Sequence, residues 1–154
     1  MSGQDNAELI LELIKAVEER DAERLFASYD DDVEFHDATS LPYGGSFCGK
    51  AEVVARFEED PEGTWLGTWG PLQPTDSERR MDARIVAASG DEVVALYHQR
   101  AVGPDGERFE KPCLGLYRIR DGKLARAQMF HYDTSAISDF LQRAQAASEQ
   151  GRRR

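Results

Sequence analysis

The sequence is short of cysteine, of basic charge and of long apolar runs, and each shortage excludes a class of protein. Its 154 residues include two cysteines, Cys48 and Cys113, which are far apart and outside any paired metal-ligand spacing. Neither a disulfide framework nor a zinc site is therefore expected. Lysine and arginine number 19 against 29 aspartates and glutamates, which gives a formal net charge of -10, and the one dense basic run is 152–154. A phosphate-binding surface needs clustered basic residues, so no nucleic-acid partner is expected.

No apolar run approaches the roughly 20 residues that a membrane-spanning helix needs. Residues 1–6 also lack the basic-then-apolar pattern of a secretion signal. We therefore expect a soluble, cytoplasmic protein with no membrane partner. The length fits one domain spanning residues 1–154, with an ordered core from about residue 5 to 147 and flexible termini.

Apolar residues at helical spacing predict two helices at the start of the chain, capped by Asp5 and Asp21. Two further helices are predicted over residues 50–58 and 135–147. The segment 41–49 is rich in glycine and predicts a turn or a tight hairpin.

Alternating segments with turn residues between them predict strands in the rest of the chain. The predicted strands are 33–37, 79–88, 92–102, 108–120 and 123–132. Hairpin residues connect the last four, which should form an antiparallel meander. Helices followed by a sheet indicate an α+β fold, in which a curved antiparallel sheet wraps around the N-terminal helices and leaves a conical internal pocket.

The most informative residue is Asp37, at the end of the strand 33–37. Side chains on a strand repeat every second residue, so Asp37 shares a face with Val33 and Phe35. An unpaired carboxylate among apolar neighbours has a raised pKa and can exchange protons near neutrality. Its replacement by asparagine should then leave stability unchanged or improved. Alternatively, Asp37 caps the turn through Thr39 and Ser40.

The last strand offers a second group of candidates. Met129, His131 and Asp133 share one face, and a histidine beside a carboxylate is a proton carrier between pH 5 and 8. With Asp37, His131 and Asp133 are therefore the catalytic candidates, and Met129 is a candidate substrate contact. The alternatives are that His131 is a hydrogen-bonded core residue and that Asp133 caps the last helix.

Aromatic residues are candidates for the wall of a mostly apolar pocket. Tyr43, Trp65 and Tyr97 are the three that we select as substrate contacts. On the strand 92–102, either Tyr97 with Gln99 or His98 with Arg100 faces inward, and Arg100 is a further candidate contact.

The histidines do not show metal-ligand spacing. His36 has the opposite parity to Asp37 and should face away from the pocket. A metal site built from His36, His98 and His131 is not expected, and neither is a cofactor.

Three segments together resemble the nuclear transport factor 2-like superfamily, in its SnoaL-like and ketosteroid-isomerase-like branch. They are 25–37 (LFASYDDDVEFHD), 45–54 (GSFCGKAEVV) and 130–136 (FHYDTSA). The resemblance implies a cone-shaped, cystatin-like α+β barrel with an internal pocket. It places Asp37 where ketosteroid isomerases keep their proton-shuttling aspartate. The oxyanion tyrosine and aspartate of that family correspond to Leu13 and Gly115, so steroid isomerisation is not expected.

The end of the last strand also resembles limonene-epoxide hydrolases of the same superfamily. Asp133 in His131-Tyr132-Asp133 would match the acid that activates water there. Arg100 would match an arginine of that family, but the position of its companion aspartate is Val102. A polar pocket floor is therefore better supported than a particular reaction.

These observations favour a cofactor-independent acid/base enzyme acting on a small, largely apolar molecule. Polyketide or terpenoid isomerases, cyclases and epoxide hydrolases all fit. The alternative is a non-catalytic ligand-binding or association module of the same fold. This alternative is favoured if Asp37 or His131 faces solvent.

We also expect a homodimer through the outer face of the sheet, because apolar residues alternate onto that face. They are Leu114, Leu116, Phe130 and Tyr132.

Overall fold

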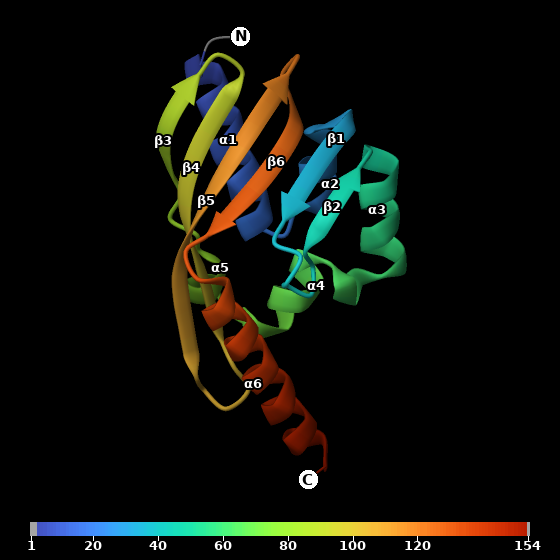
Figure 1. Cartoon of the computed structure of the whole chain (residues 1–154), viewed down its shortest axis with the longest axis vertical. Helices are drawn as coiled ribbons and strands as arrows, with labels where there is room; N and C mark the ends of the chain where they lie inside the picture. Colours follow the sequence, from blue (N-terminus) through green and yellow to red (C-terminus); the bar gives the residue numbers. More distant parts are fainter. Residues whose placement is uncertain (1–2, 154) are drawn as a thin grey trace.

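The computed structural model describes residues 3–153, and Figure 1 shows a long, bent sheet with helices gathered on one side of it. The longer helices are α1 (Gly3–Glu18), α2 (Ala22–Ala27), α3 (Lys50–Glu59) and α6 (Thr134–Arg153). Short helical segments between α3 and the third strand are η1 (Pro61–Gly63), α4 (Trp65–Trp69), η2 (Gly70–Leu72) and α5 (Asp76–Arg79). The strands are β1 (Tyr29–Asp37), β2 (Gly45–Cys48), β3 (Arg84–Ser89), β4 (Glu92–Val102), β5 (Arg108–Arg120) and β6 (Lys123–His131).

The six strands form one sheet in the order β2-β1-β6-β5-β4-β3. The predicted meander is confirmed, because β3 to β6 are antiparallel neighbours in chain order. Gly90 and Gly122 have positive φ in the tight turns of this meander, a conformation that glycine adopts without strain. The prediction of an antiparallel sheet throughout is wrong at one place, since β1 runs parallel to β6. The chain crosses from β2 to the opposite edge through α3 to α5, and the meander then brings β6 back beside β1.

The predicted element boundaries shift where local patterns were ambiguous. Tyr29, which fits the apolar spacing of the second helix, begins β1, because α2 ends at Ala27 and the N–H of Ser28 closes its last turn. Arg79 ends α5, and β3 begins only at Arg84. The helices α1 and α6 extend beyond the predicted core, while Met1, Ser2 and Arg154 lie outside the described residues. No helix within residues 3–153 is both long and apolar enough to cross a membrane.

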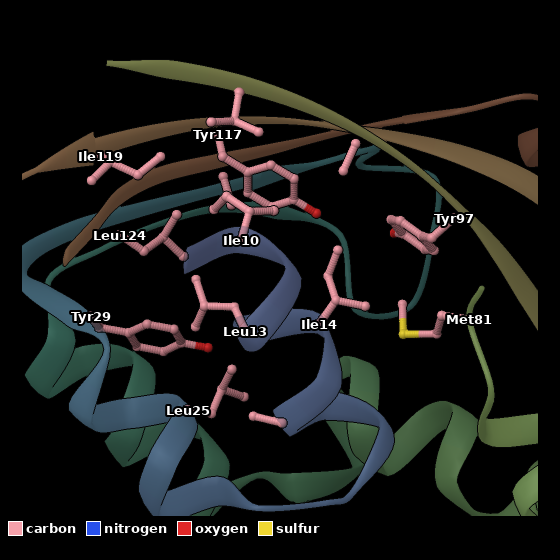
Figure 2. Close-up of a cluster of buried hydrophobic side chains, with 14 of the residues drawn as sticks. Ile10, Leu13, Ile14, Leu25, Tyr29, Met81, Tyr97, Tyr117, Ile119 and Leu124 are labelled. Atoms are coloured by element: carbon pink, nitrogen blue, oxygen red, sulfur yellow. The ribbon is translucent and has the colours of Figure 1, made fainter. Parts of the chain in front are cut away.

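The larger hydrophobic cluster lies between α1 and the concave face of the sheet, and we call it the sheet–helix cluster. Ile10, Leu13 and Ile14 recur at helical spacing, so α1 buries one stripe. They pack against inward residues of the strands, among them Tyr97 and Tyr117, as Figure 2 shows.

A smaller cluster lies where α6 meets α4 and the far ends of β4 and β5, and we call it the aromatic cluster. The rings of Trp69 and Phe140 stack at 6.2 Å between centroids, and those of Phe109 and Phe140 are 4.9 Å apart. Trp69, Ile137 and Phe140 are almost fully buried. The helix α6 therefore buries its apolar face in this cluster.

The outer face of the sheet carries the apolar residues predicted for it. Leu114 and Phe130 are register partners on β5 and β6 and are 39% and 49% exposed. Tyr132 is 76% exposed, whereas Leu116 is half-buried. The predicted homodimer through this face stays a prediction.

Candidate functional site

A cavity of about 270 Å³ lies between the helices and the concave face of the sheet. Its wall is mostly apolar, and α1 contributes Leu13, Ile14 and Val17. The polar or ionisable residues on the wall are Tyr29, His36, Asp37, Tyr43, Arg56, Thr64, Tyr97 and Tyr117. A mainly apolar cavity with a few polar groups is typical of a small-molecule site.

The structure joins Asp37 and His131, which are 94 residues apart in the chain. His131 Nε2 lies 2.7 Å from Asp37 Oδ1, and the same oxygen accepts the N–H of Ala38 at 2.7 Å. The pairing follows from the register, because Phe35 lies beside Ala127 in the parallel β1–β6 ladder. Because strand side chains alternate between faces, Asp37 lies on the same face as Phe35, and His131 lies on the same face as Ala127.

The two side chains differ in their access to the cavity. Asp37 lines the cavity with its side chain 15% exposed, whereas His131 is 4% exposed and is not part of the wall. No hydrogen bond from residues 3–153 reaches Asp37 Oδ2. A ligand in the cavity would therefore meet Asp37, with His131 behind it.

The surroundings of His131 favour its protonated form. Burial lowers the pKa of His131, but the hydrogen bond to Asp37 and the neighbouring Cys113 outweigh burial and raise the pKa to about 10. Cys113 faces His131 across the β5–β6 ladder. His131 Nδ1 is buried without a hydrogen-bond partner among residues 3–153. Near neutral pH His131 is therefore an imidazolium, and the prediction of an unpaired Asp37 is wrong.

Asp133 lies elsewhere. Its Oδ1 accepts the N–H of Ala136 at 3.0 Å in the first turn of α6, and Asp133 does not line the cavity. The structure thus shows the capping alternative, and the predicted catalytic role of Asp133 is corrected. The chain leaves β6 at His131, so the strand alternation that suggested an inward Asp133 ends before it.

Four predicted substrate contacts lie on the cavity wall: Tyr43, Trp65, Tyr97 and Met129. Tyr97 Oη donates a hydrogen bond to Met129 Sδ at 3.3 Å, and burial raises the pKa of Tyr97. The hydroxyl of Tyr43 is buried without a partner among residues 3–153. Contact with a substrate stays a prediction for all four.

The prediction that Arg100 contacts the substrate is corrected by the structure. On β4 the inward face carries Tyr97 and Gln99, so Arg100 points outward. There it forms ion pairs with Asp82 at 2.9 Å and Glu110 at 3.2 Å, and it does not line the cavity. The ambiguity that the sequence left on this strand is resolved in favour of Tyr97.

His36 lines the cavity, although its parity predicted that it faces away. Its Nδ1 lies 2.8 Å from Ser46 Oγ and its Nε2 3.3 Å from Glu34 Oε1, so neighbours on β1 and β2 hold the ring. Within residues 3–153, no three histidine, cysteine, aspartate or glutamate side chains are grouped to hold a metal ion.

Sequence reasoning missed two tyrosines of the wall, Tyr29 and Tyr117. A Cβ built on Gly115 would lie 2.3 Å from the hydroxyl of Tyr117, so the glycine makes room for this ring. A signal was present in the sequence: if Leu114 faces outward, Gly115 and Tyr117 face inward by alternation. Arg56 and Phe47 on the wall were missed as well.

Comparisons with known proteins agree with this geometry. The family model described as the SnoaL-like domain matches residues 10–127. No curated protein gave a significant match.

Solved structures share the fold. A structure of TerC co-crystallised with polyporic acid has a TM-score of 0.70 at 22% identity, covering 90% of this chain and 98% of that chain. Bal32a, from a soil-derived mobile gene cassette, has a TM-score of 0.69 at 19% identity, with 90% and 98% covered. A protein described as a putative SnoaL-like polyketide cyclase from Jannaschia sp. CCS1 has a TM-score of 0.63 at 15% identity, with 88% and 90% covered. At these identities the likeness shows the fold alone.

Proposed function

Since this chain belongs to the SnoaL-like domain family, we propose that its cavity binds a small, largely apolar molecule and that Asp37 exchanges a proton with it. The observation that supports this most directly is the Asp37–His131 pair, with its carboxylate on a mostly apolar wall. The reaction class is acid/base catalysis of the isomerase or cyclase type, at a carbon next to a carbonyl group.

The two members of the pair have different roles in this proposal. Asp37 is the catalytic residue, because its Oδ2 is free of hydrogen bonds from the described residues and can take a proton from a ligand. His131 is a positioning residue, because it fixes Oδ1 and does not touch the cavity. A charged hydrogen bond of this kind holds the carboxylate in one orientation.

Removing a proton next to a carbonyl creates an oxyanion, which needs a hydrogen-bond donor. Tyr29 and Tyr117 are available on the wall, and their hydroxyls have no partner among residues 3–153. Burial raises the pKa of both tyrosines, so they stay protonated and can donate. They would replace the donors that are missing at Leu13 and Gly115.

Epoxide hydrolysis has less support than isomerisation or cyclisation. The two residues that suggested it, Asp133 and Arg100, cap a helix and form ion pairs outside the cavity. The solved structures of similar fold include one described as a putative polyketide cyclase and one with polyporic acid bound to it. The polyketide cyclase makes compounds of polyketide type the first to test.

The test is deuterium exchange, which requires no knowledge of the product. A panel of apolar ketones and polyketide-like esters is incubated with the protein in heavy water, and NMR follows exchange next to the carbonyl. We expect exchange by the natural protein and a fall of about a hundredfold or more in Asp37→Asn. Asp31→Asn, an exposed carboxylate on the same strand, is the matched control and should be unchanged.

Two results would count against the proposal. Equal exchange by Asp37→Asn and the natural protein would remove Asp37 as the base. Saturable binding of panel members without any exchange would favour the alternative, a ligand-binding module of the same fold.

A further inference from the structure

One cation of the cavity wall has no negative partner. In a chain of net charge -10, several other arginines form ion pairs, for example Arg100 with Asp82 and Arg143 with Glu107. Among residues 3–153, no carboxylate lies within ion-pair distance of Arg56, which lines the cavity. A half-buried cation left unpaired in so acidic a protein requires an explanation.

The position of Arg56 is well defined. It lies in the last turn of α3, and its guanidinium carbon is 3.7 Å from the ring centroid of Phe47. Its Nη2 donates to the carbonyl of Gly63 at 2.8 Å. A guanidinium has five N–H donors, so this arrangement fixes the group and leaves further donors for a ligand.

A second arginine adds positive charge beside the cavity. Arg20 borders an open hollow of about 310 Å³ that shares Phe57, Thr64 and Leu66 with the cavity. Its guanidinium lies 5.8 Å from the ring of Trp65 and donates to Gln73. Like Arg56, it has no carboxylate within ion-pair distance in the described part of the chain.

A third arginine, Arg79, donates from Nε to the backbone carbonyl of Gln73 at 2.9 Å. Burial, and to a smaller extent the positive charge of Arg79, lowers the pKa of Arg20. Like charges this close, without counter-charges, favour a bound anion.

Simpler roles do not account for Arg56. A basic residue in the last turn complements the helix dipole, but that role does not require the guanidinium to lie on Phe47 in the cavity wall. The carboxylate of Asp60 approaches Gly63, whose carbonyl Arg56 contacts, yet Asp60 forms no ion pair with Arg56.

We propose that Arg56 binds an anionic group of the ligand, and that the cavity is built for a small apolar molecule carrying a carboxylate or an ionised enol. The proposal deepens the proposed function, since it uses the same cavity. Planar oxyanions of this kind match the planar fork of a guanidinium. Arg20 adds to the positive potential that attracts such a ligand.

The sheet register separates this anion site from the proton-exchanging group. Gly45 pairs with Asp37, and Phe47 pairs with Phe35, two residues further along β2. Two residues of strand span about 7 Å. The ligand's negative group would therefore bind at Phe47 and Arg56, away from Asp37, and its reactive carbon would lie at Asp37.

Two fluorescent probes of nearly equal shape test the proposal. Anilinonaphthalene sulfonate carries a negative group, and N-phenylnaphthylamine lacks it. Binding of each probe is titrated with the natural protein, Arg56→Gln, Arg56→Lys and, as matched control, Arg118→Gln on the outer face of the sheet. Arg118 is paired with Glu92 and lies away from the cavity wall.

We expect Arg56→Gln to weaken the sulfonate probe about tenfold or more and to change the neutral probe less than twofold. Arg56→Lys should retain part of the affinity, and Arg118→Gln should match the natural protein. Unchanged binding of the neutral probe also shows that the variant is folded. An equal loss of both probes, or no loss of the sulfonate, would overturn the proposal.

These outcomes are separate from a failure of the proposed function. Probe binding needs no turnover, so the Arg56 result stands even if Asp37→Asn does not change deuterium exchange.

Discussion

The two hydrophobic clusters differ in their packing. The aromatic cluster is filled by the rings of Trp69, Phe109 and Phe140, which contact one another directly. The sheet–helix cluster borders the cavity of about 270 Å³, so several of its side chains have empty space on one side. A densely packed anchor at one end of the sheet thus coexists with a hollow core at the other.

The comparison indicates where stability and function reside. A side chain next to a void makes fewer dispersion contacts, so the hollow cluster gives up stability for a binding volume. The Asp37–His131 pair also lies at the cavity and not in the aromatic cluster.

The largest effect should come from matched truncations in the two clusters. We expect Phe140→Ala in the aromatic cluster to lower the free energy of unfolding by about 3–5 kcal/mol. Phe35→Ala at the cavity wall should cost about half as much, because Phe35 is only partly buried and faces the void. Urea unfolding measures both. Equal losses of unfolding free energy would mean that the cavity does not make the sheet–helix cluster less tightly packed than the aromatic cluster.

Asp37→Asn should also destabilise the protein at pH 7, by about 2 kcal/mol, since it removes the charged hydrogen bond that stabilises the His131 imidazolium. The sign is opposite to the one predicted for an unpaired carboxylate. Urea unfolding of Asp37→Asn beside Asp31→Asn checks it. An Asp37→Asn variant as stable as the natural protein would instead support the prediction that Asp37 is unpaired.

The pH dependence of stability has a definite sign. The pKa of His131 is about 10 in the folded protein against about 6.5 in the unfolded chain. Its stabilising contribution is therefore complete below about pH 6.5 and is lost as the pH rises toward 10. The stability gap between the natural protein and His131→Gln should shrink over this range. A gap that widens with pH would contradict the charged pair.

The smallest effect on unfolding is expected at the outer face of the sheet, where we propose a homodimer. Phe130→Glu should convert a dimer into a 17.3 kDa monomer and change the unfolding free energy of the monomer by less than about 0.5 kcal/mol. Leu11→Glu, an exposed apolar residue on α1, is the control and should leave the dimer intact. Light scattering that finds a monomer in the natural protein would end this proposal.

Local alternation predicted much of the fold. Turn residues defined the meander, and strand parity placed Asp37, Met129 and His131 on inward faces. The β1–β6 pairing could not be read locally, because it joins segments about 90 residues apart in parallel. Tyr29 was misplaced on a helix because a short apolar run fits both periods.

The candidate site was harder to predict because its chemistry depends on partners. Asp37 was selected on its apolar surroundings, yet its hydrogen-bond partner, His131, lies 94 residues away in the chain. Asp133 alternates correctly with His131, but the strand ends between them and the carboxylate caps α6. Arg56 carried no signal, since an arginine in the last turn of a helix is common.

The most direct measurement is an NMR titration of the His131 imidazole, assigned with His131→Gln. We predict that the ring stays protonated through neutral pH and titrates near 10 in the natural protein. In Asp37→Asn its pKa should fall to the ordinary range or below, because burial then acts without the opposing charge. A His131 that titrates near 6.5 in the natural protein, or one unaffected by Asp37→Asn, would contradict the charged pair on which this account of the cavity depends.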